Sequence, residues 1–186
     1  MAITRLGPNQ SINLASNITG TLPTGNGGTG ATSFSPGKIL QVVTSENVYA
    51  TSTTSASFTD ILSSSGTTWE TAITPSATSS KIIIATSIYA YWEQNGAANN
   101  RGDVNLSYKI ASGSYTQVQN SQLGNYDYGG SGVQARLRIA FHYLISPSTT
   151  SAVTIKFQIK SAGSATGVIN DGGTADSNVT LYEVAG

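Results

Sequence analysis

The feature that most constrains the fold is a two-residue alternation of apolar and polar side chains. It runs through three stretches, residues 104–110, 136–145 and 153–160. Successive side chains of a β-strand point to opposite faces of the sheet, so this period is typical of strands with one buried face. We therefore expect three strands here, each contributing one face to a hydrophobic core.

Shorter stretches of the same kind predict further strands at residues 39–43, 57–62, 67–73, 115–123 and 179–184. Residues 81–92, which include Ile82-Ile83-Ile84, predict a strand that is more buried than its neighbours. Clusters of Gly, Pro, Asn and Ser separate these stretches, and no window has the 3.6-residue period of a helix. The chain is therefore predicted to be all-β, an antiparallel β-sandwich or jelly roll.

The composition changes near residue 37. Residues 1–36 contain Pro8, Pro23 and Pro36 and many glycines, which weaken strands and helices. Their apolar residues are spaced singly and cannot form a core, so we expect an extended arm, residues 1–36, ahead of a sandwich, residues 37–186. The apolar residues expected to anchor this arm on another surface are Ile3, Leu6, Ile12, Leu14, Ile18, Leu22 and Phe34.

Charge and composition exclude several classes of protein. Only 10% of the residues are charged, and nine Lys and Arg balance nine Asp and Glu, so no basic patch for nucleic acid is expected. No apolar run approaches the ~20 residues of a membrane-spanning helix. The chain has no Cys, which excludes disulfides, thiolate metal sites and Cys nucleophiles.

Signals for catalysis or metal binding are weak. His142 is the only His, and the alternation puts it on the polar face of a strand, as a surface or interface residue. Residues 25–30 match G-x-G-x-x-G, but neither the preceding strand nor the following helix of a phosphate site is predicted. Arg101-Gly102-Asp103 is expected to be a turn. We predict no catalytic, cofactor-binding or metal-binding residues and no enzymatic activity.

One loop carries hard oxygen ligands. Asp171 and Asp176 flank Gly172-Gly173, a composition that sometimes binds calcium, although the spacing matches no EF-hand. A polar hairpin is the favoured interpretation.

Two aromatic groups lie beside predicted loops. Tyr91 and Trp92 end the stretch 81–92, and Tyr126 and Tyr128 lie in a Gly-rich segment. Aromatic faces next to amide and carboxylate groups suit sugars, since the rings stack on C–H faces while the polar groups bind hydroxyls. One hypothesis is therefore that these residues contact a host surface glycan or another partner. The alternative is that the rings pack against a neighbouring subunit or complete the core.

Several segments resemble virion proteins of tailed bacteriophages. Residues 17–30, NITGTLPTGNGGTG, are similar to an element common in phage tail fibres. Residues 38–43, 51–60, 75–84 and 146–154 follow in an order that resembles the C-terminal β-domains of such proteins. The resemblance implies a homotrimer, an N-terminal segment that attaches to the particle and an outward-facing β-domain. The GGTG element occurs once and no coiled-coil heptads precede it, which differs from long fibres.

These observations together predict a non-enzymatic structural protein on the exterior of a tailed-phage particle. The favoured form is a homotrimeric short fibre or adhesin, with a host glycan as a candidate ligand. Residues 1–36 are expected to bind other virion proteins or to interlock the subunits of the trimer. The alternative is a capsid decoration protein that clamps neighbouring capsomers.

Overall fold

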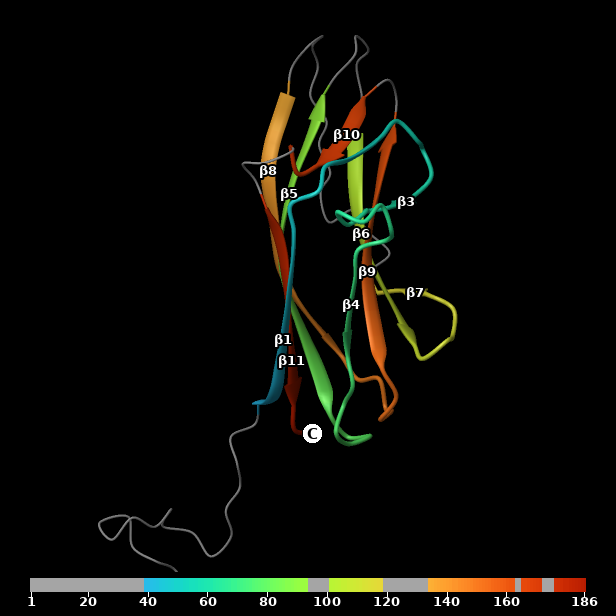
Figure 1. The fold of residues 1–186 in the computed structure, drawn as a ribbon, viewed down its shortest axis with the longest axis vertical. Coiled ribbons are helices and arrows are strands. Elements are labelled where there is room, and N and C mark those ends of the chain that lie inside the picture. The colour runs from blue at the N-terminus through green and yellow to red at the C-terminus, as the bar shows by residue number, and fades with distance from the viewer. Residues whose placement is uncertain (1–38, 94–100, 119–133, 163–164, 172–175) are drawn as a thin grey trace, which may run out of the picture. The chain divides into compact units, whose positions relative to one another are not determined.

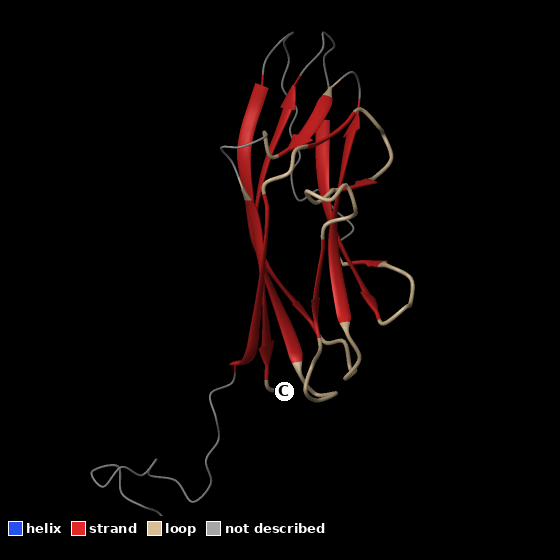
Figure 2. Cartoon of the chain, viewed as in Figure 1, coloured by secondary structure: helices blue, strands red, loops and turns tan. Residues whose placement is uncertain are grey.

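The computed structural model describes residues 39–93, 101–118, 134–162, 165–171 and 176–186. These residues form β-strands and no helix, so they contain no helix that could span a membrane, and the predicted all-β class is confirmed (Figure 2). The strands are β1 (Ile39–Asn47), β2 (Thr51–Thr53), β3 (Thr59–Asp60), β4 (Glu70–Ile73), β5 (Lys81–Glu93), β6 (Arg101–Ile110), β7 (Thr116–Gln117), β8 (Gln134–Ile145), β9 (Val153–Ala162), β10 (Thr166–Ile169) and β11 (Ser177–Val184). The predicted arm lies outside the described residues, as do its proposed anchors Ile3, Leu6, Ile12, Leu14, Ile18, Leu22 and Phe34.

The strand pairings are nested. β1 pairs with β11, β4 with β9, β5 with β8 and β6 with β7, always antiparallel. The chain thus folds like one long hairpin whose tip lies between β6 and β7. Two further pairings, β11 with β5 and β9 with β6, join these pairs into two sheets. This eight-strand, two-sheet connectivity is that of a jelly roll.

The two sheets lie side by side as layers (Figure 1). Sheet A has the order β8-β5-β11-β1, and β10 and β2 continue the lines of β11 and β1. Sheet B has the order β7-β6-β9-β4, and β3 lies beside β9 beyond β4. We call the end where β1 begins and β11 ends the proximal end of the sandwich. The opposite end, where β5 ends and β8 begins, is the distal end.

The core is formed by the inward-facing side chains of both sheets. Along β5 every second residue is buried, from Ile82 to Trp92, while the residues between them face outward. β9 contributes Val153, Ile155, Phe157 and Ile159, each at most 1% exposed. Trp69 packs on Phe157 with ring centroids 5.3 Å apart. Burial of each such side chain stabilises the fold by roughly 1.5–3 kcal/mol, so the alternation noted in the sequence is the main source of stability.

Most strands occur where the sequence predicts them, and two were missed. β2 and β10 have three and four residues, too few for an alternation to be recognised. Residues 101–103 were expected to form a turn, which is wrong, because they begin β6 and pair with β9. Asp103 is 0% exposed and its Oδ2 lies 3.0 Å from Lys160 Nζ, so this carboxylate is not available to a partner in solution.

Sheet A is interrupted at two places, between β1 and β2 and between β10 and β11, and buried polar side chains bridge both breaks. Asn170 follows β10 with a left-handed φ of 54°, a conformation that Asn tolerates better than most residues. Its Nδ2 donates to the carbonyl oxygens of Asn47 (2.8 Å) and Tyr49 (3.1 Å), between β1 and β2. Its Oδ1 accepts a 2.7 Å bond from the hydroxyl of Ser177, the first residue of β11. The two breaks therefore lie side by side, and one amide group satisfies both.

The Trp92 indole restricts two positions to glycine, one in β6 of sheet B and one in β10 of sheet A. A Cβ atom at Gly102 would lie 1.3 Å from Trp92 Nε1, and one at Gly167 would lie 2.8 Å from the same atom. The indole is 2% exposed and fills the space that side chains would otherwise occupy. The sandwich can close at its distal end only because β6 and β10 carry no side chain at these positions.

We therefore expect Gly102→Ala to destabilise the protein by more than about 3 kcal/mol, above the usual range for overpacking, since the methyl group overlaps a ring that cannot move. Urea denaturation followed by tryptophan fluorescence measures the loss. Gly113→Ala is the matched control, because its methyl group meets only the Ile110 carbonyl oxygen at 3.0 Å in an exposed turn. Equal stability of the two variants would contradict this account of the distal closure.

A buried carboxylate holds the proximal end together. Glu183 in β11 is 1% exposed, and its Oε1 accepts bonds from the Ser76 hydroxyl and backbone N–H, both 2.6 Å, and from the Ser80 hydroxyl, 2.7 Å. Its Oε2 accepts a 2.7 Å bond from Gln41 Nε2 of β1. Burial raises the pKa of Glu183, but these hydrogen bonds outweigh it and lower the pKa to about 2.

The folded-state pKa of Glu183 lies below its ordinary value of 4.5, so this group stabilises the fold fully above that pH. The stabilisation is lost as the pH falls from 4.5 toward 2. We expect Glu183→Gln to lower the free energy of unfolding by about 2 kcal/mol at pH 7, and the gap from the parent protein to close on acidification. Chemical denaturation across this pH range measures it. Glu46→Gln, at an exposed position of β1, should leave the pH profile unchanged.

Candidate interaction face

The outer face of sheet A is built from rows of side chains that cross all its strands. The register aligns residues of β8, β5, β11 and β1 that point away from the core. One row consists of Leu144, Ile83, Tyr182 and Val42. The row proximal to it consists of Lys81, Val184 and Ile39. We call these two rows, together with Leu40, the apolar rows.

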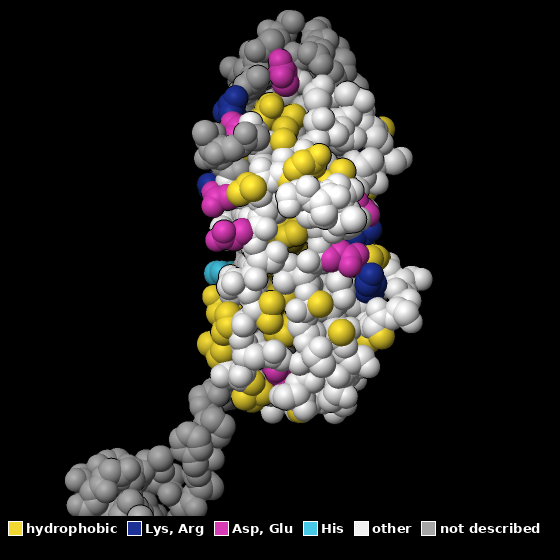
Figure 3. All heavy atoms as spheres, viewed as in Figure 1, with side chains coloured by type: hydrophobic (Ala, Val, Ile, Leu, Met, Phe, Trp, Pro, Cys, Tyr) yellow, Lys and Arg dark blue, Asp and Glu magenta, His cyan; other side chains and the backbone are white. Residues whose placement is uncertain are grey.

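The apolar rows expose large hydrophobic side chains to solvent. Ile39 is 57% exposed, Val42 53%, Leu144 53% and Leu40 41%. Ile39, Ile83, Tyr182 and His142 line a shallow, mainly apolar depression of about 430 Å³. Figure 3 shows hydrophobic atoms gathered at the left edge of the molecule, below its one His. A soluble domain seldom exposes such a group of side chains unless it binds something.

Two rows of small or polar side chains follow toward the distal end. The first consists of His142, Ala85, Thr180 and Thr44, and the second of Ala140, Ser87, Asn178 and Glu46. His142 is exposed on this face, which agrees with its prediction as a surface residue, although exposed Leu144 lies on the same side of β8. The face thus passes from large apolar groups to small and polar ones along the same strands.

Arginines and tyrosines occupy the distal rows, where Tyr89 is paired with Arg138 and Tyr91 with Arg136. Arg136 Nη1 donates to the Tyr89 hydroxyl and to Asp171 Oδ2, both at 2.8 Å. Its Cζ lies 4.8 Å from the centroid of the Tyr91 ring. The guanidinium group of Arg136 is therefore held by its neighbours. The side chains of Arg136 and Arg138 both remain 47% exposed.

The predicted contact residues are separated by this geometry. Tyr91 faces outward and is half-buried, with the guanidinium of Arg136 over its ring. Trp92 faces the core and is 2% exposed, which corrects the hypothesis that its ring contacts a receptor and agrees with the alternative that it completes the core. Adjacent residues of a strand point to opposite faces, so one of the two had to be buried. Tyr126 and Tyr128 lie outside the described residues.

The two aspartates considered for calcium have protein partners. Asp171 binds Arg136, and Asp176 Oδ1 lies 3.5 Å from Arg138 Nη2. Arg138 also donates to the Asp176 carbonyl oxygen at 3.0 Å. In the described part of the chain, no group of three or more His, Cys, Asp or Glu side chains could hold a metal ion.

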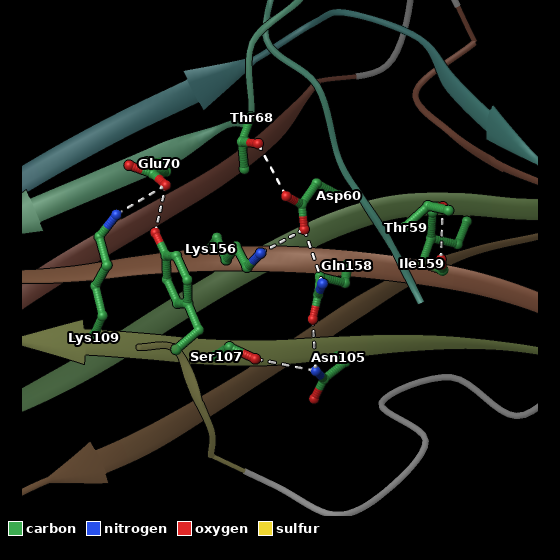
Figure 4. Close-up of polar contacts among 11 residues, drawn as sticks. Thr59, Asp60, Thr68, Glu70, Asn105, Ser107, Lys109, Lys156, Gln158 and Ile159 are labelled. Carbon is green, nitrogen blue, oxygen red and sulfur yellow. Dashed lines mark hydrogen bonds and ion pairs between the residues drawn. The ribbon is translucent and has the colours of Figure 1, made fainter. Parts of the chain in front are cut away.

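Sheet B presents a different outer face, occupied by its own polar network (Figure 4). Asp60 accepts bonds from Lys156 (2.6 Å), Gln158 (2.8 Å) and Thr68 (3.0 Å). Burial raises the pKa of Asp60, but the bonds from Lys156, Gln158 and Thr68 outweigh it and lower that pKa. These contacts tie β3 to β9, so the carboxylate stabilises the sheet.

Tyr115 extends this network toward β4 and β6. Its hydroxyl donates to Glu70, and its ring lies 4.6 Å from Lys109 Nζ and 4.3 Å from Lys156 Nζ. Burial, followed by the bond to Glu70, raises the pKa of Tyr115. The polar groups of this face already bind one another, whereas the apolar rows of sheet A have no such partners among the described residues.

No protein-family model matches the chain, and a search of curated proteins finds no match. Among solved structures, two T=1 particles of infectious bursal disease virus, one of them the D431N mutant of its VP2 protein, overlap 78% and 79% of this chain. The unmutated particle is 14% identical to this chain, with a TM-score of 0.38, and the match covers 36% of its own chain. The D431N mutant is 11% identical, with a TM-score of 0.36, and the match covers 37% of its own chain. This overlap is loose, so the jelly-roll assignment rests on the strand pairings.

Proposed function

We propose that this chain is a non-enzymatic structural component on the exterior of a tailed-phage particle, acting as a homotrimeric short fibre or adhesin. Residues 1–36 attach it to other virion proteins and the jelly roll projects outward. The observation that carries the proposal is the two-ended outer face of sheet A. Large apolar side chains gather at the proximal end, where the described chain begins at Ile39, and ordered arginines and tyrosines gather toward the distal end.

The separation of these two ends suits a protein that is held at one end and binds at the other. From Ile83 to Tyr91 the strand β5 advances eight residues, about 26 Å at ~3.3 Å per residue. A group bound at the distal rows is therefore well away from an attachment at the apolar rows. The segments 17–30 and 146–154, which resemble phage fibre proteins, supply the virion context.

Non-enzymatic action is favoured by the roles of the carboxylates. Glu183 is enclosed by hydroxyl and amide donors, Asp60 holds β3 against β9, and Glu70 binds Lys109 at 3.4 Å and Tyr115. A glycosidase requires two carboxyl groups facing a substrate across an open cleft. Each of these three acidic side chains instead serves as a structural acceptor.

The apolar rows also favour a second candidate, a capsid decoration protein. An exposed apolar surface beside the start of the described chain could equally lie against the capsid shell, and the single GGTG element fits a protein without a fibre shaft. In that case the protein would clamp neighbouring capsomers in many copies, and the distal rows would have no receptor.

Immunogold labelling of phage particles, with an antibody against residues 39–186, distinguishes these functions. We expect gold at the tail or its tip if the protein is a fibre. Gold spread over the head would contradict the fibre and indicate the decoration protein. Particles that carry no gold, although a control antibody against the major capsid protein labels them, would overturn both.

Receptor binding by the distal rows is tested separately with purified protein and host cells. We expect Tyr91→Ala to reduce attachment at least several-fold, since it removes the ring that orders Arg136. The double variant Tyr126→Ala/Tyr128→Ala tests the other predicted aromatic pair. Tyr49→Ala, at a 40% exposed tyrosine beyond β1, is the matched control and should bind normally. Unchanged attachment of the first two variants would remove the glycan hypothesis.

A further inference from the structure

We infer that the free edge of β8 accepts an extended, uncharged strand from another polypeptide, which continues sheet A by one strand. The site consists of backbone N–H and C=O groups along residues 136–144, and its ligand class is an extended peptide segment. The inference concerns the jelly roll alone, so it does not depend on where the chain lies in a particle.

β8 is an outermost strand of sheet A. It pairs with β5 over its full length, Gln134–Ile145, and the described residues place no strand along its other edge (Figure 1). The Tyr143 side chain reaches toward sheet B, where its hydroxyl donates to the Val118 carbonyl oxygen at 3.0 Å. That contact is made by a side chain, so it leaves the backbone groups at the edge of β8 unused.

The direction of the backbone groups along β8 follows from the contacts of β5. The N–H of Tyr89 donates to the Ser177 hydroxyl (3.0 Å), and its carbonyl oxygen accepts from the Asn170 N–H (3.1 Å), both on the side of β10 and β11. Backbone direction alternates along a strand, so even-numbered residues of β5 point toward β8, where Ile88 is opposite Ile139. Opposite residues of an antiparallel pair are bonded together or not at all, so the odd-numbered residues of β8 bond to β5. The residues whose backbone groups point to the free edge are Arg136, Arg138, Ala140, His142 and Leu144.

This edge lacks the features by which sheets usually block a further strand. Common blocks are a bulge, a proline or a charged side chain at the edge. The register between β5 and β8 runs without a shift, and residues 139–145 contain no Pro, Lys, Arg, Asp or Glu. Uncharged segments of high β-propensity are those that pair most readily with an added strand.

The two arginines of β8 do not cover the edge either. Arg136 Nη1 donates to Asp171, which follows β10, and Arg138 Nη2 lies 3.5 Å from Asp176, which precedes β11. Both β10 and β11 pair with β5 on the side opposite to β8. The arginine side chains therefore reach across β5 and away from the free edge, and an added strand meets the backbone of β8 without a cation over it.

The edge specifies the chemistry of its occupant. N–H and C=O groups with a two-residue repeat match another extended backbone, the mode of recognition called β-augmentation. The residue of the added strand opposite Leu144 extends the apolar rows, so it should be apolar. A second copy of β8 matches less well, because antiparallel pairing about Ala140 would place Arg136 of one copy beside Leu144 of the other. These points favour a strand from a different polypeptide.

The first test is amide hydrogen exchange of the full chain, resolved by residue with NMR. In dilute solution we expect the N–H groups of Ala140, His142 and Leu144 to exchange at least about 100-fold faster than those of Phe141 and Tyr143, which bond to β5. Slow exchange of the first three in dilute solution would show that the chain covers its own edge. Slowing only at high protein concentration would assign the edge to a second copy. Either result would overturn the inference.

The second test adds a strand to the full chain. The probe is a heptapeptide of alternating threonine and valine with acetylated and amidated ends, in molar excess. We expect it to slow exchange at Ala140, His142 and Leu144 several-fold and to leave Phe141 and Tyr143 unchanged. The matched control is the same peptide N-methylated at every second residue, which removes the donors of one edge and should have no effect. Equal effects of the two peptides, or no effect of either, would overturn the inference.

The third test removes a donor from β8. His142→Pro deletes an N–H that points to the free edge, so we expect the variant to fold and the peptide to lose its effect. His142→Ala keeps this N–H and is the matched control, so it should respond to the peptide like the parent protein. A folded His142→Pro variant that still responds would overturn the inference. The N-methylated peptide makes the same deletion on the opposite strand, so it decides the question without this variant.

Discussion

The double pairing of β5 is the interaction on which the rest of the structure depends. Its twelve residues Ile82–Glu93 pair with β8 on one side, while β11 and β10 share its other side. Its even-numbered side chains enter the core, and its odd-numbered ones form the centre of the outer face. The core, the apolar rows and the arginine–tyrosine rows are therefore consequences of one strand and its register. A shift of one residue would exchange the two faces.

The sequence predicts the strands of this protein well because their signal is local. Alternation within 136–145 or 153–160 depends only on neighbouring residues, and the structure confirms both as β8 and β9. The sheets could not be predicted in the same way, since Ile39 pairs with Val184 across most of the chain. The short strands β2 and β10 were missed because their stability comes from longer neighbours and from buried Asn170, which no local pattern reveals.

The candidate interaction face was missed for a related reason. Leu144, Ile83, Tyr182 and Val42 come from four separate stretches, and only the register brings them into one row. Ile83 stands within Ile82-Ile83-Ile84, which predicts a buried strand, yet its side chain faces outward. Parity along this strand could have distinguished Tyr91 from Trp92, because an alternation assigns neighbouring residues to opposite faces. The prediction instead grouped them by their aromatic character.

The position of β1 has a mechanical consequence. If the particle holds the chain ahead of Ile39 and a host holds the distal end, tension runs parallel to the strands of sheet A. Residues Gln41–Asn47 pair one to one with Glu183–Ser177, so the hydrogen bonds between β1 and β11 would be sheared together and not opened one after another. Glu183, which accepts from Gln41, lies at the proximal end of this pair, where the load would enter. Under such a load, the β1–β11 pair of the nested jelly roll would act as the force-bearing clamp.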